Sequence, residues 1–330
     1  MKQTRTLRRA IAATFAATLV TSLGACAGDD LAEEDETTTS DESSDAASED
    51  ASAPAGGGDV TLASQSFDEA ALVTAMYAGV LEDAGYTVET QLVDTRDIYM
   101  AEFPGNVDIV PEYVSGIGDF LNVQANGEGA EPITDSDTDA SLEAIAPLAE
   151  AEGITLLEPS PATSQNAYFV SQDFADSEGL SALSDLEGQS VVLAAAPDCE
   201  GREDCEAGLS DVYGIDITEL LPLGYASPET YGAVIDGEAQ LGQTGTLDGT
   251  LEEQGLVLLE DDRGIQPAQN LVPAVSSDFL AENEAVEPLL DDLMAALDNE
   301  VLAELLVRVT VDRETVEDVA NDFLTEEGLV

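Results

Sequence analysis

Two cysteines, Cys199 and Cys205, enclose a short acidic loop that carries one arginine, Arg202. The chain of 330 residues has 70 acidic and only nine basic residues, so a positive charge placed in such a loop is scarce. A guanidinium presents a rigid fork of N–H donors that matches a carboxylate. The loop therefore predicts an anion contact at Arg202, with a surface salt bridge to Glu200 or Glu203 as the alternative.

The cysteine count indicates an oxidising compartment. Cys26 lies near the N-terminus, which leaves Cys199 and Cys205 as an even pair, and outside the cytoplasm such a pair is normally a disulfide. A zinc site is the alternative, but the chain has no histidine and no second cysteine pair to complete it. Because a glycine-rich phosphate loop and a serine nucleophile elbow are also missing, we expect no metal, no cofactor and no enzyme activity.

Residues 1–25 have the pattern of an export signal. Four basic residues precede an apolar and small-residue run over residues 10–23, which is too short to span a bilayer. The run ends in Leu23-Gly24-Ala25-Cys26, which resembles the lipobox of bacterial-type lipoproteins. That resemblance implies cleavage before Cys26 and a lipid on its thiol, which would anchor the chain to the outer face of the cytoplasmic membrane. A plain secretory peptide is the alternative.

Residues 26–58 predict a disordered acidic tether, because they contain almost only Asp, Glu, Ser, Thr, Ala and Gly. The formal net charge of the whole chain is −61. This charge disfavours nucleic acid as a partner. Acidic excess without lysine in the exported part is typical of adaptation to high salt, where repulsion between surface charges is screened. It would still mildly attract a cationic ligand.

From residue 59 onward, strands and helices alternate in two successive units. The first, over residues 60–157, has a β-α-β-α-β order that predicts a mainly parallel sheet, with one buried strand over residues 107–110 ended by Pro111. The second unit, from residue 168, repeats this alternation of strands and helices. Three amphipathic helices close the chain near residues 285–297, 299–309 and 313–324. The pattern predicts two α/β lobes with a ligand cleft between them.

Eight motifs occur in order over this region: Ala63-Ser64-Gln65-Ser66-Phe67-Asp68-Glu69, Asp94-Thr95-Arg96-Asp97-Ile98-Tyr99, Val107-Asp108-Ile109-Val110-Pro111-Glu112-Tyr113, the Cys199–Cys205 loop, Leu247-Asp248-Gly249, Leu259-Glu260-Asp261-Asp262-Arg263-Gly264-Ile265-Gln266-Pro267, Asn270-Leu271-Val272-Pro273-Ala274-Val275, and Val319-Ala320-Asn321-Asp322-Phe323-Leu324. Together they closely resemble the glycine betaine/choline (quaternary amine) substrate-binding proteins of ABC importers. The two-cysteine loop is most similar to the actinobacterial branch. The resemblance implies a type II periplasmic-binding-protein fold, with one lobe from residues 59–162 and 270–330 and the other from residues 163–269.

The resemblance also implies the partners and the site. The lobes would close on a small zwitterionic or cationic solute and present it, as a monomer, to an ABC permease. Tyr113 and Tyr231 match positions of an aromatic cage that holds a quaternary ammonium, and Arg202 matches an arginine that holds the ligand carboxylate. Gln65 stands where relatives carry a lysine that reaches the ligand, and we expect both Gln65 and the adjacent Ser64 to bind the ligand. Packing within the lobe is the alternative role for both tyrosines.

The cage is incomplete by this comparison. Relatives carry an aspartate and a tyrosine at the positions of Ser164 and Asn166, and an aromatic residue near Gly245. Tyr168, two positions after Asn166 in a predicted strand, should share its face at a different depth. We therefore expect Asn166 and Tyr168 at the site, and a ligand that is glycine betaine or another solute such as ectoine, carnitine or choline. A sensor lipoprotein without a permease is the alternative function.

Overall fold

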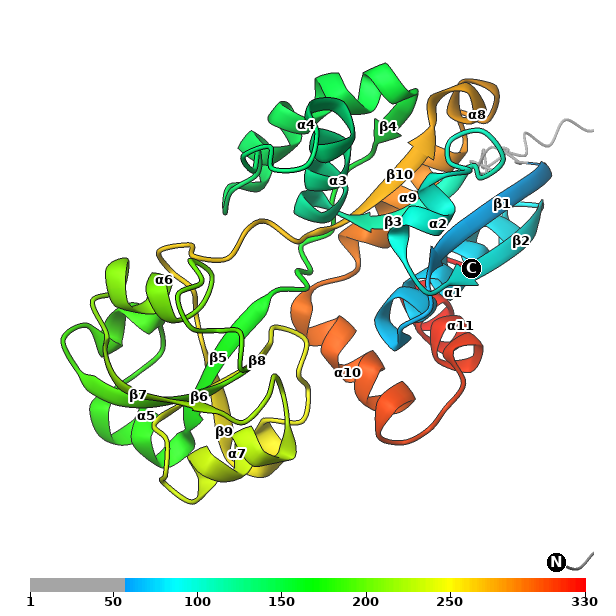
Figure 1. Ribbon diagram of the computed structural model, residues 1–330. Helices are drawn as coiled ribbons and strands as arrows, with labels where there is room; N and C mark the ends of the chain where they lie inside the picture. Colours follow the sequence, from blue (N-terminus) through cyan, green and yellow to red (C-terminus); the bar gives the residue numbers. More distant parts are fainter. Residues whose placement is uncertain (1–56) are drawn as a thin grey trace, which may run out of the picture. The chain divides into compact units, whose positions relative to one another are not determined.

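The computed structural model describes residues 57–330 (Figure 1). The predicted signal segment, Cys26 and the predicted tether up to residue 56 lie outside the described residues. None of the helices within residues 57–330 is both long enough and apolar enough to cross a membrane.

The first sheet has the strand order β2-β1-β3-β10-β4. Its strands are β1 (Gly58–Gln65), β2 (Tyr86–Val93), β3 (Ile109–Tyr113), β4 (Ile154–Leu156) and β10 (Leu271–Ser276). β1 runs parallel to β2 and β3, whereas β10 runs antiparallel to β3 and β4. The expectation of a mainly parallel sheet is confirmed, because β1, β2, β3 and β4 all run in one direction. The exception is β10, which arrives from a distant segment and enters the sheet in the opposite direction.

The prediction that the buried strand over residues 107–110 ends at Pro111 is wrong, since β3 continues to Tyr113. Proline cannot donate a hydrogen bond to a neighbouring strand. In this sheet Pro111 lies opposite Pro273 of β10. The two residues that lack an N–H group therefore face each other, and the strand can pass through both.

Helices from the two ends of the described chain pack together on the first sheet. α1 (Asp68–Asp83) lies beside α11 (Val316–Glu327), as Figure 1 shows. They approach so closely that a side chain at Gly79 would meet Leu324 at 2.5 Å. The remaining helices of this part are α2 (Arg96–Met100), α3 (Val114–Asn126), α4 (Thr138–Glu152), α8 (Ser277–Glu282), α9 (Val286–Ala295) and α10 (Asn299–Thr310). The three predicted C-terminal helices are thus confirmed, but the last begins only at Val316.

The second sheet has the order β7-β6-β8-β5-β9. Its strands are β5 (Asn166–Ser171), β6 (Ser190–Ala195), β7 (Asp216–Pro222), β8 (Leu241–Gly245) and β9 (Leu256–Leu259). β6 is parallel to β7 and β8, and β5 is antiparallel to β8 and β9. Three α-helices accompany this sheet: α5 (Gln172–Glu178), α6 (Glu206–Asp211) and α7 (Pro228–Ile235).

The fold is therefore built on two mixed α/β sheets. Every strand that precedes residue 157, together with β10, belongs to the first sheet, and the strands between residues 166 and 259 form the second. The exact lobe boundaries stay a prediction. The predicted disulfide is confirmed: Cys199 and Cys205 are bonded, with their Cα atoms 5.3 Å apart, and both are buried in the core beside the second sheet.

Candidate functional site

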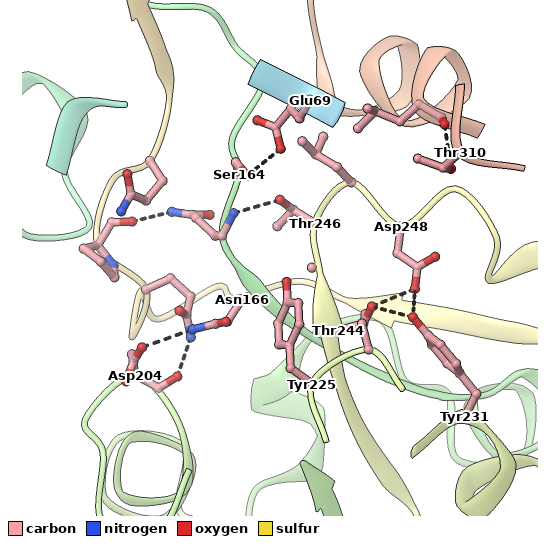
Figure 2. Close-up of a pocket in the computed structure, with 18 of the residues that line it drawn as sticks. Glu69, Ser164, Asn166, Asp204, Tyr225, Tyr231, Thr244, Thr246, Asp248 and Thr310 are labelled. Carbon is pink, nitrogen blue, oxygen red and sulfur yellow. Dashed lines mark hydrogen bonds between the residues drawn. The ribbon is translucent and has the colours of Figure 1, made fainter. Parts of the chain in front are cut away.

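A cavity of about 750 Å³ is lined by residues that are far apart in the sequence (Figure 2). One wall carries Glu69, from the first turn of α1, and Leu306 and Thr310, from α10. The remaining lining comes from Ser164–Asn166, Arg202, Asp204, Tyr225, Ala226, Tyr231, Thr244–Asp248, Gln266, Pro267 and Gln269. Segments beside both sheets thus meet around one space, which is where the predicted fold would bind its ligand.

Glu69 is a carboxylate at this cavity whose hydrogen-bond partners are all neutral. Its Oε1 accepts from the Tyr113 hydroxyl at 2.7 Å, and its Oε2 accepts from the Ser164 hydroxyl at 2.9 Å. None of the ion pairs among the described residues includes it. Burial raises the pKa of Glu69, and the two hydroxyl donors oppose that rise. The carboxylate links α1, β3 and the segment that leads into β5.

The raised pKa of Glu69 predicts how the free energy of unfolding depends on pH. Between the ordinary value of 4.5 and the raised pKa, the folded state keeps a proton that the unfolded state has lost. The contribution of Glu69 to stability therefore falls as pH rises through this window. Glu69→Gln should remove that fall, as measured by urea unfolding between about pH 4 and pH 7. Ser164→Ala removes a donor to the charged form and should extend the fall to higher pH, so identical pH profiles for all three chains would contradict the assignment.

Asp248 is a second carboxylate of the cavity lining and is held in place by four hydrogen bonds. Its Oδ2 accepts from the hydroxyls of Tyr231 and Thr244, both at 2.6 Å, as Figure 2 shows. Its Oδ1 accepts from the Thr250 amide at 3.1 Å and the Thr250 hydroxyl at 2.6 Å. Burial, followed by the bond to Asp248, raises the pKa of the Tyr231 phenol. The carboxylate is fixed in position by neutral donors and adds negative charge to the cavity wall.

Arg202 also lines the cavity, but its guanidinium already holds two carboxylates. Nε donates to Asp204 Oδ1 at 2.9 Å, Nη2 donates to Asp204 Oδ2 at 2.5 Å, and Nη1 donates to Asp198 Oδ2 at 3.0 Å. The alternative prediction, a salt bridge to Glu200 or Glu203, named the wrong partners, because Arg202 pairs with Asp198 and Asp204. The backbone turns twice within the disulfide loop, since the Arg202 amide donates to the Cys199 carbonyl and the Arg202 carbonyl accepts from Cys205.

Asp204 is the point on which several predicted site residues converge. Asn166 Nδ2 donates to its Oδ2 at 3.1 Å, and the Tyr168 hydroxyl donates to its backbone carbonyl at 2.9 Å. Gln266 Nε2 donates to the same carbonyl at 2.7 Å. The prediction that Asn166 and Tyr168 share one face of a strand is confirmed, because both reach the same residue.

Tyr225 provides an aromatic ring where the sequence comparison found one missing. A side chain at Gly245 would meet the Tyr225 hydroxyl at 2.6 Å, so glycine leaves the space that this phenol fills. Tyr225 is 49% exposed. Partial burial raises the pKa of its phenol, and the carboxylates of Glu69 and Asp248 add to the rise. The ring therefore lies within the field of two carboxylates and is open to a ligand.

The predicted ligand-binding residues divide into two groups. Asn166, Arg202 and Tyr231 line the cavity. The other four do not: Ser64 is buried in β1, Gln65 ends the same strand, Tyr113 lies behind Glu69, and Tyr168 is buried below Asp204. Their direct contact with ligand stays a prediction.

Sequence reasoning did not select the three carboxylates Glu69, Asp204 and Asp248. Among 70 acidic residues, none of them is distinguished by type. The one usable signal was their place in the motifs of the resemblance: Glu69 ends the opening motif, Asp204 is inside the cysteine loop, and Asp248 is in Leu247-Asp248-Gly249.

The substrate-binding domain of the ABC-type glycine betaine transport system is a family whose model matches residues 58–326. The chain belongs to this family. Two glycine betaine-binding proteins are similar along the same region. The protein of Pseudomonas aeruginosa is 28% identical over 82% of this chain and 88% of its own length, and YehZ of Escherichia coli is 28% identical over 82% and 90%.

Solved structures of glycine betaine family members show the fold. Apo YehZ from Escherichia coli superimposes with a TM-score of 0.67 at 24% identity, covering 82% of this chain and 99% of that structure. A glycine betaine/carnitine/choline ABC transporter structure reaches 0.70 at 18% identity, with coverages of 82% and 99%. The two α/β units with a ligand cleft are thus those of a periplasmic binding protein. The chain is a substrate-binding protein of the glycine betaine ABC transport family.

Proposed function

We propose that this chain binds a quaternary-ammonium compatible solute such as glycine betaine in the cavity and delivers it to an ABC permease. The observation that carries the proposal is the pairing of aromatic rings with carboxylates on the cavity wall: Tyr225 and Tyr231 stand with Glu69 and Asp248. A quaternary ammonium cannot donate hydrogen bonds, so ring faces and nearby negative charge are what can hold it. The names of the two similar glycine betaine-binding proteins support the same ligand class.

Arg202 is the group that we assign to a ligand carboxylate. Among the lining residues that the structure describes, Arg202 is the only arginine, and a guanidinium is the side chain best suited to a carboxylate. Asn166 lies beside it and can add an amide donor. Tyr113 would act indirectly, by holding Glu69 in position through its hydroxyl.

Choline is the second candidate ligand, and one observation favours it. The side-chain oxygen of Gln269, a cavity residue, is buried and lacks a hydrogen-bond donor among the described residues. A buried acceptor without a donor is costly. The hydroxyl of choline can donate to such an oxygen, whereas glycine betaine has no donor.

A calorimetric titration tests the proposal. The purified chain, in buffer of high salt concentration, is titrated with glycine betaine, choline, carnitine and ectoine. Saturable heat is expected with at least one quaternary ammonium solute. The absence of heat with glycine betaine, choline and carnitine would contradict the ligand class, even if ectoine bound.

Replacing Tyr225 by leucine should weaken every quaternary ammonium ligand. The loss of one ring face is worth about 0.5–2 kcal/mol, or roughly 2- to 30-fold in Kd. The control is Phe174→Leu, because Phe174 is an aromatic residue of α5 that packs against the core of the second sheet and does not line the cavity. Equal effects of the two substitutions would contradict a ring contact at Tyr225.

We further propose that the chain is anchored outside the cytoplasm by a lipid on Cys26. The lipobox-like sequence supports the anchor, and the Cys199–Cys205 disulfide supports an oxidising compartment. In cells fed a labelled fatty acid, the chain should take up the label and Cys26→Ala should not. Label in both chains would contradict anchoring at Cys26.

A further inference from the structure

Asp204 occupies the edge of Arg202 that a ligand carboxylate would need. The guanidinium presents Nε and Nη2 side by side, and both donate to the two oxygens of Asp204. This two-point arrangement is the geometry that arginine favours for any carboxylate. Nη1 is bound to Asp198 on the outer side. A zwitterionic solute therefore meets an arginine whose preferred contact is already made.

The Asp204 carboxylate does not depend on Arg202 alone for its position. Asn166 donates to its Oδ2, so the carboxylate has a third donor at the cavity. Tyr168 and Gln266 both donate to the Asp204 carbonyl, which fixes the backbone below it. Moving Asp204 away from Arg202 would disturb side-chain bonds to two residues. Several hydrogen bonds therefore hold Asp204 against Arg202, and a ligand carboxylate has to displace Asp204 or share Arg202 with it.

The negative charge of the cavity further disfavours a ligand that carries a carboxylate. Three carboxylates line it, from Glu69, Asp204 and Asp248, whereas Arg202 is the one cationic side chain among the lining residues that the structure describes. Because the less exposed Asp204 already pairs with Arg202 at the cavity, a ligand carboxylate finds little uncompensated positive charge there. A ligand that is only cationic meets no such opposition.

We propose that Asp204 is a specificity-determining residue that competes with ligand carboxylates for Arg202, and that it biases the cavity toward purely cationic quaternary amines and against zwitterions. The inference rests on the proposed function, because it takes the cavity to be the solute site. The proposed function names groups that attract both zwitterions and purely cationic amines. The inference adds Asp204 as a residue that disfavours the zwitterions.

Titration of glycine betaine and choline into Asp204→Asn tests the inference. The substitution keeps the shape of the side chain and removes its charge, so Arg202 becomes available to a ligand carboxylate. We expect glycine betaine to bind about tenfold more tightly, on the scale of one charge-assisted hydrogen bond. Choline should bind about two- to threefold more weakly, because the cavity loses negative charge. The measured quantity is the ratio of the two Kd values.

The matched control is Asp198→Asn. It removes the same charge from the same guanidinium, but Asp198 is exposed and does not line the cavity. Its ratio of Kd values should stay within about twofold of the unaltered chain. A ratio unchanged in Asp204→Asn, or weaker glycine betaine binding there, would overturn the inference and leave Asp204 as a residue that merely positions Arg202.

A double substitution separates competition from positioning. If Asp204 competes, Arg202→Ala should cost more glycine betaine affinity in the Asp204→Asn chain than in the unaltered chain, whereas a positioning role gives the opposite order. Should Asp204→Asn fail to fold, as judged by circular dichroism, Tyr168→Phe removes a hydrogen bond that fixes Asp204 without changing a cavity-lining residue, and it should shift the ratio in the same direction. Failure of the unaltered chain to bind any solute would contradict the proposed function, whereas binding with an unchanged ratio would contradict this inference alone.

Discussion

Replacing Arg96 by alanine is expected to lower the free energy of unfolding by about 3 kcal/mol, the lower end of the cost of breaking a buried ion pair. Arg96 Nε and Nη2 donate to the two oxygens of Glu112 at 2.8 and 3.0 Å. Glu112 is only 1% exposed, so without Arg96 its charge would be buried and uncompensated. The Tyr99 hydroxyl and the Tyr113 amide also donate to this carboxylate and would retain part of its stabilisation.

The Arg96–Glu112 pair is linked to the site through the neighbouring residue Tyr113. Glu112 precedes Tyr113, whose hydroxyl holds Glu69 at the cavity. A side chain at Gly116, in the first turn of α3, would meet Arg96 Nη2 at 2.5 Å, so the arginine also fixes how α3 leaves β3. Loss of the pair should therefore loosen the support of Glu69 as well as the fold.

Urea unfolding measures this effect, and Arg308→Ala is its matched control. Arg308 binds two carboxylates, of Glu314 and Asp322, whereas Arg96 binds one, but the Arg308 cluster is at the surface. Its removal should cost less than about 1 kcal/mol. Comparable losses for Arg96→Ala and Arg308→Ala would show that burial of Glu112 does not decide the energy.

Asp248→Asn is expected to weaken binding of a quaternary ammonium solute by about tenfold, which corresponds to about 1.4 kcal/mol. The substitution keeps the shape and can keep hydrogen bonds to Tyr231, Thr244 and Thr250, because hydroxyl groups can accept as well as donate. It removes one of the carboxylate charges at the cavity wall. Two unit charges about 4 Å apart near a protein surface attract by about 4 kcal/mol, and solvent screening reduces this figure.

The control for Asp248→Asn is Glu187→Gln, which removes one negative charge away from the cavity. Glu187 is exposed and pairs with Arg263. Calorimetric titration with choline should show no more than a twofold change for this variant. If both variants weakened choline equally, the effect would come from the net charge of the protein and not from Asp248 at the site.

Local pattern was sufficient to predict most of the elements. Apolar spacing in α1, α9 and α10 and the alternation in β2 are properties of short segments, so they are legible without tertiary contacts. Direction within a sheet is not such a property. The antiparallel entry of β10 depends on where a distant part of the chain returns, and the sequence comparison implied that return only through the family fold.

The site shows the same division. Residue type and spacing were enough to predict that Cys199 and Cys205 form a pair with Arg202 between them, that Asn166 and Tyr168 share a strand face, and that positive charge is scarce. They were not enough to predict which of 70 acidic residues face the cavity, that Tyr225 fills the space left by Gly245, or that Asp204 holds Arg202. Residue type and periodicity act over a few positions, whereas a binding site is an arrangement of side chains that only folding brings together.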